Sequence, residues 1–485
     1  MKHYQHNDVV LKREGIMSRK RCFFPIFLLV IVLIDLPKPS WSMGEHKSKD
    51  KEKPPFYPSL INTHTGQYVK STEFMSPEIC SGCHIEIYKQ WNGSMHSHAY
   101  VDPVFQALWK LGSKETQSFI DKLCAGCHTG IGTVSEEIIM RGGEFQVSDI
   151  AKKGVQCDLC HTVVKSTFLE TPTHEPQNAS IVLEPGTIKR GPYKDAVSPF
   201  HETAYSELHT TSEFCANCHH VFHPVTNFHI ERTYDEWKYS IYAQNGIQCQ
   251  DCHMVPIEQS IETARTLKKQ SNPGKACITG PDRNQVYTHE FVGGNFTITN
   301  LLGSPHHAEI AKKRLQSAAE LTLNLPDTVK RGTVTTVGVE ITNVGAGHNL
   351  PTSLTEVRQM WIELVVMDAH DTTIYHSGML DEEGNIDPRA KIFHAKSVDA
   401  EGKHTYKPWE INRFEYNSTI PPKGAITTEY TFLLPQNIRG TLTVKATLRY
   451  RSYPQSLAHL LLGKDTLTLP IVDMAKKEGT VIVKE

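Results

Sequence analysis

Five copies of one short pattern, Cys-x-x-Cys-His, hold most of the reactive side chains in this sequence, and ten of its 12 cysteines belong to them. Cysteines at positions i and i+3 lie on one side of a helical turn, and the histidine at i+4 projects close beside them. Each string can therefore hold one flat group by two sulfur atoms and one imidazole. The strings are Cys80-Cys83-His84, Cys124-Cys127-His128, Cys157-Cys160-His161, Cys215-Cys218-His219 and Cys249-Cys252-His253.

Three kinds of chemistry could use such cysteine pairs. Zinc sites are built from paired Cys-x-x-Cys modules, and exported proteins can oxidise the same pair to a disulfide. Neither explains why a histidine follows every pair directly. Covalent haem explains it, because both cysteines bond to the porphyrin and the histidine binds its iron from below. We therefore expect five haem c groups with iron, attached through the ten cysteines and ligated by the five histidines of the strings.

All five strings lie between Cys80 and His253, about one for every 35 residues. So dense a set of porphyrins leaves little room for an ordinary apolar core. We expect the porphyrins themselves to form the core, held by short helices and long loops. Iron centres this crowded would form a chain along which electrons can move.

The opposite face of each iron needs a second ligand. Twelve further histidines lie between residues 64 and 307, enough to make every haem bis-histidine. Iron with two imidazoles has no vacant position, which suits electron transfer rather than substrate chemistry.

Local sequence selects among these histidines. His96 follows Trp91 in QWNGSMH, with His98 as its alternative, and His201 ends SPFH. His289 opens HEFVGGN, whose two glycines permit close approach to a flat ring. We expect these three residues to be metal ligands, and His174 and His223 to complete the set of five.

The strings and their surroundings resemble a known family. CSGCHIEIYKQWNGSMH, SPFHETAYSEL and EWKYSIYAQNGIQCQDCHM are similar to segments of the tetrahaem cytochrome that accepts electrons from hydroxylamine oxidoreductase and of its wider multihaem relatives. The resemblance covers roughly residues 76–300. It implies a mainly α-helical fold with stacked haem pairs, an electron-carrier role, and His96 as a distal ligand. In the tetrahaem relative one haem lacks a distal ligand, and this chain differs by a fifth string and a long C-terminal extension.

Secondary-structure patterns change after the last string. Ser304-Pro305 can begin a helix over residues 306–321, and short β-like runs follow at 333–342, 359–367, 426–434 and 441–450. We predict an α + β multidomain protein, a helical and loop-rich multihaem cytochrome domain followed by an immunoglobulin-like β-sandwich. His348, in NVGAGHNLPTS, is either a hairpin-loop residue, which we prefer, or a ligand reaching across the domain boundary. The odd thiol Cys277 receives no role.

The N-terminus has the pattern of a secretory signal. A basic segment, residues 12–21, precedes 13 apolar residues, 22–34, and small residues flank a cleavage site near 42. The apolar run is shorter than the roughly 20 residues that span a bilayer, so we expect no stable membrane span after its removal. The predicted organisation is a signal peptide, a flexible leader, a pentahaem domain and the β-sandwich, over residues 1–42, 43–75, 76–320 and 321–485.

Composition limits the functions that remain. The 485 residues are 39% apolar and 21% charged with net charge −2, which excludes a disordered chain and a nucleic-acid binder driven by bulk charge. We expect an exported electron carrier, periplasmic or at the cell surface, whose redox partners are quinol-oxidising membrane proteins or other cytochromes. The alternatives are a reductase of a small nitrogen or sulfur compound at one five-coordinate haem, and a structural role in which the β-domain docks the protein.

Overall fold

The computed structural model describes residues 54–463 and 468–485. The predicted signal peptide, the first part of the leader and the basic segment before the apolar run therefore lie outside the described residues. Lys53–Glu485 forms one compact unit. Within the described residues, no helix combines the length and the apolar character needed to cross a membrane.

Residues 54–75 are packed against the rest of the fold and are not the flexible leader predicted from the sequence. Phe56, Ile61 and Phe74 are at most 4% exposed and belong to one apolar cluster with Trp109. Strand β1 (Asn62–Thr63) pairs in parallel with β5 (Ile181–Leu183). Burial of these apolar side chains fixes the segment against the rest of the fold.

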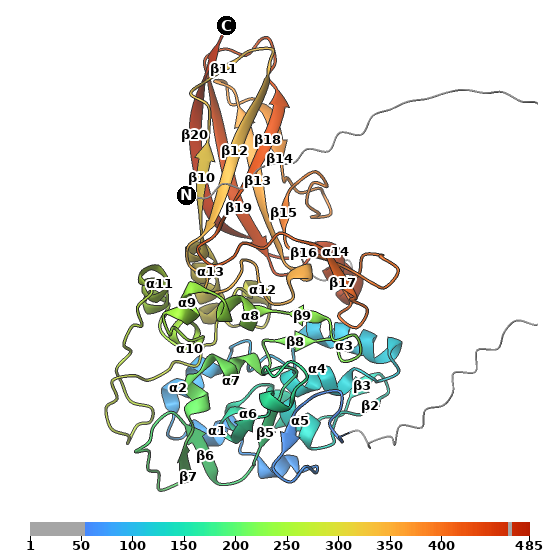
Figure 1. The fold of residues 1–485 in the computed structure, drawn as a ribbon, viewed down its shortest axis with the longest axis vertical. Helices are drawn as coiled ribbons and strands as arrows, with labels where there is room; N and C mark the ends of the chain where they lie inside the picture. The colour runs from blue at the N-terminus through green and yellow to red at the C-terminus, as the bar shows by residue number, and fades with distance from the viewer. Residues whose placement is uncertain (1–53, 464–467) are drawn as a thin grey trace, which may run out of the picture. The chain divides into compact units, whose positions relative to one another are not determined.

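The string-bearing part consists of short helices joined by loops, as predicted (Figure 1). Its small strands form two- and three-stranded sheets. The helices are α1 (Pro77–Cys80), α2 (Ile85–Trp91), α3 (Pro103–Glu115), α4 (Asp121–His128), α5 (Gly130–Val134), α6 (Cys157–His161), α7 (Ser212–Ala216), α8 (Thr233–Lys238), α9 (Ile241–Gln244), α10 (Gln250–His253), α11 (Ile257–Thr266), α12 (Phe296–Leu301) and α13 (Pro305–Ala318). The remaining strands are β2 (Met140–Arg141), β3 (Glu144–Phe145), β4 (Val163–Ser166), β6 (Ile188–Gly191), β7 (Glu202–Tyr205), β8 (Val221–Phe222) and β9 (His229–Glu231).

This part also contains an apolar core, although we expected the porphyrins themselves to form the core. Trp109 stacks on Phe145 with ring centroids 3.6 Å apart, and Ile131 and Val134 are fully buried beside them. Trp109 lies on helix α3. Asp102 caps the N-terminus of this helix, because its carboxylate accepts hydrogen bonds from the backbone amides of Val104 and Phe105. The porphyrin sites therefore adjoin a conventional core on one side.

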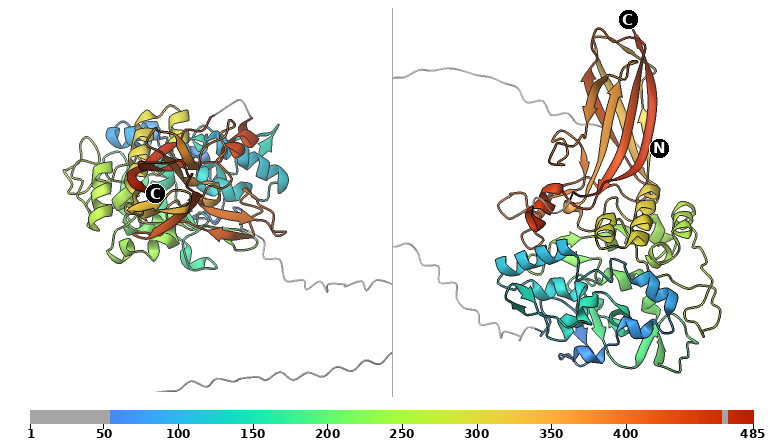
Figure 2. Two further views of the ribbon diagram at one scale, coloured as in Figure 1. Left: turned by 90° about the horizontal axis from the view of Figure 1, so that it is seen from above. Right: turned by 180° about the vertical axis from the view of Figure 1, so that it is seen from behind.

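The C-terminal part contains two larger sheets (Figure 2, orange and red strands). One has the strand order β10-β12-β18 and the other β11-β20-β19-β13-β14, with β15 also paired to β13. The four β runs predicted from sequence are confirmed as β12 (Val334–Asn343), β13 (Gln359–Met367), β18 (Ala425–Leu433) and β19 (Thr441–Arg451). The other elements are β10 (Ala319–Asn324), β11 (Thr328–Lys330), β14 (Thr373–Ser377), β15 (Ile392–Phe393), β16 (Ala395–Val398), β17 (Arg413–Asn417), α14 (Gln455–Leu462) and β20 (Val472–Lys484).

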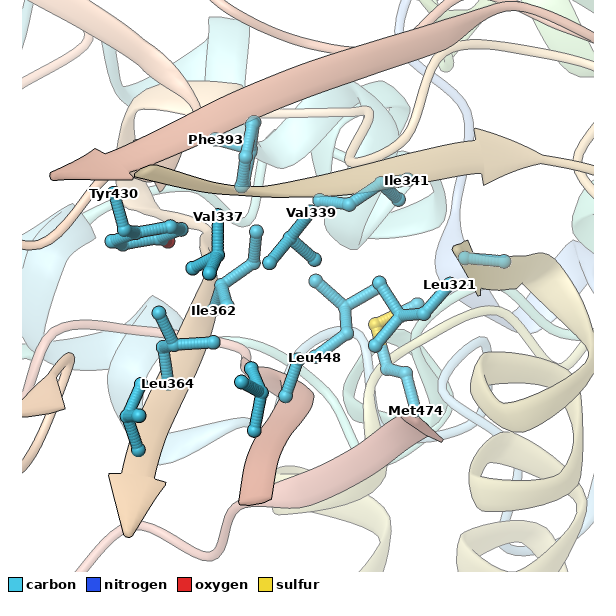
Figure 3. Close-up of a cluster of buried hydrophobic side chains, with 14 of the residues drawn as sticks. Leu321, Val337, Val339, Ile341, Ile362, Leu364, Phe393, Tyr430, Leu448 and Met474 are labelled. Atoms are coloured by element: carbon cyan, nitrogen blue, oxygen red, sulfur yellow. The ribbon is translucent and has the colours of Figure 1, made fainter. Parts of the chain in front are cut away.

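Both sheets contribute to one apolar core (Figure 3). Val339 of β12, Ile362 of β13 and Leu448 of β19 are fully buried in a single cluster, and their side chains face one another. Alternation of buried and exposed residues along β12 and β19 directs one face of each sheet inward. This is a two-sheet arrangement, and its immunoglobulin-like type stays a prediction.

The helix predicted over residues 306–321 ends early. Pro305 occupies the first turn as expected, but the helix stops at Ala318, and Ala319–Leu321 begin β10. β10 pairs antiparallel with β12, Leu321 opposite Ile341, and alternates buried with exposed side chains. Pairing with β12 and burial of Leu321 override the helix-forming tendency of Ala319 and Glu320.

Truncation of Leu448 tests the shared core. Leu448→Ala removes buried methyl groups between the sheets and should lower the free energy of unfolding by about 2–5 kcal/mol. Denaturant unfolding followed by far-UV circular dichroism measures it. The matched control is Leu433→Ala, since Leu433 is 66% exposed at the end of β18 and its truncation should change stability by less than about 0.5 kcal/mol. Equal effects of the two substitutions would contradict a core between the sheets.

Candidate haem-binding site

Every Cys-x-x-Cys-His string lies on or beside a short helix. The third string is α6 itself, the second ends α4, and Cys249 caps α10. In the first string Cys80 ends α1, and in the fourth Cys215 lies in α7. The helical turn therefore places both sulfur atoms and the following imidazole of each string on one side, as covalent haem attachment requires.

The proximal imidazoles are oriented by their second ring nitrogen. Nδ1 of His84, His128, His161 and His253 lies 2.6–2.9 Å from a backbone carbonyl oxygen. A carbonyl can only accept, so Nδ1 carries the proton and Nε2 keeps its lone pair for a metal. His219 differs, because its Nδ1 lies 3.8 Å from a carboxylate oxygen of Glu231. Burial alone would lower the pKa of His219, but Glu231 raises it to about 9.

All five strings open onto one continuous cavity. Its volume is about 1420 Å³, and its lining includes all ten attachment cysteines and all five proximal histidines. Sites for one drug-sized ligand are usually about 300–1,000 Å³, so this space is suited to several large groups. The cavity, rather than any single pocket, is the candidate site.

Four pairs of imidazole rings face one another in this cavity. Their ring centroids are 6.2–6.4 Å apart and their planes are inclined by 16–29°. Two imidazoles on opposite sides of one iron should have centroids about 6 Å apart, because each metal–nitrogen bond is about 2 Å and each nitrogen lies about 1 Å from its ring centre. The residues therefore fit haem iron held between two histidines. The pairs are His84 with His201, His219 with His96, His161 with His289, and His253 with His348.

Three of the predicted distal ligands, His96, His201 and His289, thus lie opposite a proximal histidine. Trp91 holds the His96 segment, since its indole N–H donates to the carbonyl of Val155, and the amide of Val155 donates to the carbonyl of His96. Burial lowers the pKa of His96 and of His289 to about 3, so both rings are neutral. Neutral imidazole is the form that binds a metal.

His348 occupies the fourth distal position, although the loop alternative was preferred from sequence. Its Nδ1 lies 2.8 Å from the carbonyl oxygen of Asn349, which leaves Nε2 free for the side facing His253. Gly345 allows the loop to approach α13, because a Cβ there would lie 2.2 Å from the carbonyl oxygen of Ser317. Gly345 and Gly347, which precede His348, are the sequence feature that could have indicated this close approach.

Two predicted ligands, His174 and His223, do not lie opposite a proximal histidine. His174 is exposed, has φ of 56° and has Nδ1 2.9 Å from the carbonyl oxygen of Leu169. His223 uses both ring nitrogens, accepting at Nδ1 from the amides of Val225 and Thr226 and donating at Nε2 to a carbonyl. Hydrogen bonding within their own loops gives both side chains another role.

The second string has a different surrounding. Phe105 of α3 stacks on His128 with centroids 3.7 Å apart and an interplanar angle of 4°. Within the part of the chain that the structure describes, no histidine ring is stacked with His128. A ring stacked face to face on an imidazole at this distance lies on the same side of a porphyrin as that imidazole, so Phe105 does not take the opposite axial position. Without a facing imidazole among the described residues, this string is the candidate for an open coordination position.

The strings are also close to one another. Three pairs of thiols from different strings are in direct contact. Contact with Cys157 lowers the pKa of Cys80. Contact with Cys127 raises the pKa of Cys218, and contact with Cys249 raises the pKa of Cys215. These contacts link the first string with the third, the second with the fourth, and the fourth with the fifth. The third and fourth are linked by the electrostatic effect of Cys218 on the pKa of the Cys160 thiol, which burial raises to about 12. The five sites therefore form one contiguous array.

Comparison with known proteins agrees with this geometry. A family model described as cytochrome c554 and c-prime matches residues 79–162, which contain the first three strings. A penta-heme cytochrome c552 from Thermochromatium tepidum has a similar fold, with TM-score 0.53 and 18% identity over 84% of this chain and 99% of that one. These findings support a multihaem c-type cytochrome. No curated protein matches the chain.

Two further solved structures each match over 34% of the chain. They are the CARDB domain of PF1109 from Pyrococcus furiosus, at TM-score 0.15 and 9% identity over 94% of its length, and a cohesin module from Clostridium perfringens, at 0.18 and 13% over 96%.

Substitution of His348 tests its pairing with His253. His348→Ala removes the imidazole that faces His253, so the number of high-spin haems should rise from about one in five to about two in five. Electron paramagnetic resonance of the oxidised protein counts both spin states. His376→Ala, an exposed histidine on β14, is the matched control and should leave the spectrum unchanged. An unchanged spectrum in His348→Ala would contradict the assignment.

Proposed function

We propose that this protein is an exported pentahaem c-type cytochrome that carries electrons between respiratory redox partners, at the periplasm or cell surface. The observation that carries the proposal is the set of four facing imidazole pairs, each at the separation that two ligands of one iron require. When bound, haem supplies iron that alternates between the ferric and ferrous states. Quinol-oxidising membrane proteins or other cytochromes are the proposed partners.

The protein's own residues suit that task in three ways. Paired imidazoles would fill both axial positions at four sites, which blocks substrate binding there. Backbone carbonyls hold the proximal rings in one tautomer, so ligation needs no proton rearrangement. Contacts between neighbouring strings keep adjacent sites close enough to exchange electrons.

His128 supports a second candidate function. A site with the imidazole of His128 and no facing imidazole would leave iron open to a small ligand, as a reductase of a nitrogen or sulfur compound needs. Phe105 stacks on this imidazole at 3.7 Å and so holds its plane without covering the opposite position. Electron transfer is preferred because the other four sites have facing imidazoles.

Steady-state and binding measurements separate the two functions. The holo protein, reduced by a viologen, should show no turnover of nitrite, hydroxylamine or sulfite, yet should reduce a soluble cytochrome acceptor in a stopped-flow mixture. About one haem in five should be high-spin, and nitric oxide should bind only that fraction. Sustained turnover of one of these compounds would contradict the electron-carrier function and support the reductase.

A further inference from the structure

A cluster of potential metal ligands lies outside the haem-facing cavity. His220, His229 and Asp235 each present one ligand atom, and these three atoms lie within 4.8 Å of one another. None of the three residues lines the large cavity. The cluster is therefore separate from the haem sites, although His220 follows the fourth proximal ligand directly in sequence.

Local structure brings the three residues together from separate elements. His220 follows the turn after α7, and its ring projects away from the cavity that His219 lines. The β8–β9 hairpin pairs Phe222 with His229 and stacks the two rings with centroids 4.1 Å apart. Asp235 lies in the first turn of α8.

A fourth residue, Glu175, faces the same point from the loop that precedes β5. Its Oε2 lies 3.9 Å from Nε2 of His220, while its other oxygen bonds to the ammonium of Lys238. Arg232 is 3.9 Å from Asp235 but is 48% exposed. These two cations neutralise part of the acidic charge and still leave carboxylate oxygens facing the imidazoles.

Distances within the cluster match those between ligands of one metal ion. Nε2 of His220 lies 3.5 Å from Oδ1 of Asp235, and Nδ1 of His229 lies 3.3 Å from Oδ2 of the same carboxylate. Hydrogen bonds between such atoms would be about 2.7–3.2 Å. Ligands about 2.0–2.1 Å from a tetrahedral zinc ion are about 3.4 Å apart, which is close to the spacing observed.

Unpartnered buried atoms give an independent indication. His220 is completely buried, and its Nδ1 lies 2.7 Å from the carbonyl oxygen of Pro176, so Nδ1 carries the proton. Its Nε2 has no hydrogen-bond partner, and neither has Oδ1 of Asp235, 3.5 Å away. Buried lone pairs that face one another without a proton or cation are costly. A bound cation would satisfy them together.

We propose that His220, His229, Asp235 and Glu175 bind one divalent first-row cation of the zinc type. Two imidazoles and two carboxylates are a donor set that zinc accepts, and the closed, buried geometry is that of a structural site. The ion would tie the Glu175 loop and α8 to the segment that carries His219. This proposal does not depend on the electron-carrier function.

Elemental analysis of the purified holo protein tests the site. After exchange into metal-free buffer and incubation with equimolar zinc, plasma mass spectrometry should find about one zinc for every five irons. His229→Gln should weaken zinc binding by at least about tenfold, whereas the exposed control His376→Gln should retain it. The iron content of both variants, which reports the haem sites, should be unchanged.

Anomalous diffraction at the zinc edge keeps the proposal falsifiable if His229→Gln does not fold. Crystals of the wild-type holo protein should show a peak between His220, His229 and Asp235 that disappears below the edge, with the irons as internal references. Zinc far below one equivalent in the wild type, or zinc retained by His229→Gln, would overturn the site. That result would leave a protonated His220 paired with Asp235 as the explanation of the cluster.

Discussion

The separation of facing imidazoles is the constraint on which the string-bearing part of the structure depends. Each pair must stand about 6 Å apart, centre to centre, because an iron atom has to bind both rings at bond length. The proximal ring is fixed by its helical turn and by a carbonyl bonded to Nδ1. The distal ring comes from another segment of the chain, and loops in this part deliver His96, His201 and His289.

The C-terminal part takes a direct role in the site. Its loop carries His348, and contacts with α8 hold that loop in place: Glu236 accepts hydrogen bonds from the amide of Asn349 and the hydroxyl of Thr352. Burial raises the pKa of Glu236 to about 7, while these two donors oppose the shift. The β-sheets therefore stabilise one haem site as well as their own core. A purely docking role for this part does not account for His348.

Sequence reasoning predicted what is locally determined. The five strings, the proximal histidines and the runs that became β12, β13, β18 and β19 depend on neighbouring residues, and their chemistry or alternation is visible in the sequence. Distal ligands depend on the tertiary path. His84 and His201 lie far apart in the chain, so only nearby features such as Trp91 for His96 could favour a candidate. His174 and His223 had no such feature, and hydrogen bonds within their own loops engage them instead. The end of the predicted helix at residue 321 was missed because pairing of β10 with β12 is a long-range effect.

Intact mass spectrometry of the secreted protein under denaturing conditions shows whether haem is covalently attached at every string. We expect a mass equal to that of the mature polypeptide plus five haem groups, with colour that acid acetone does not extract. A mass equal to that of the bare polypeptide, or a pigment released into acid acetone, would contradict it.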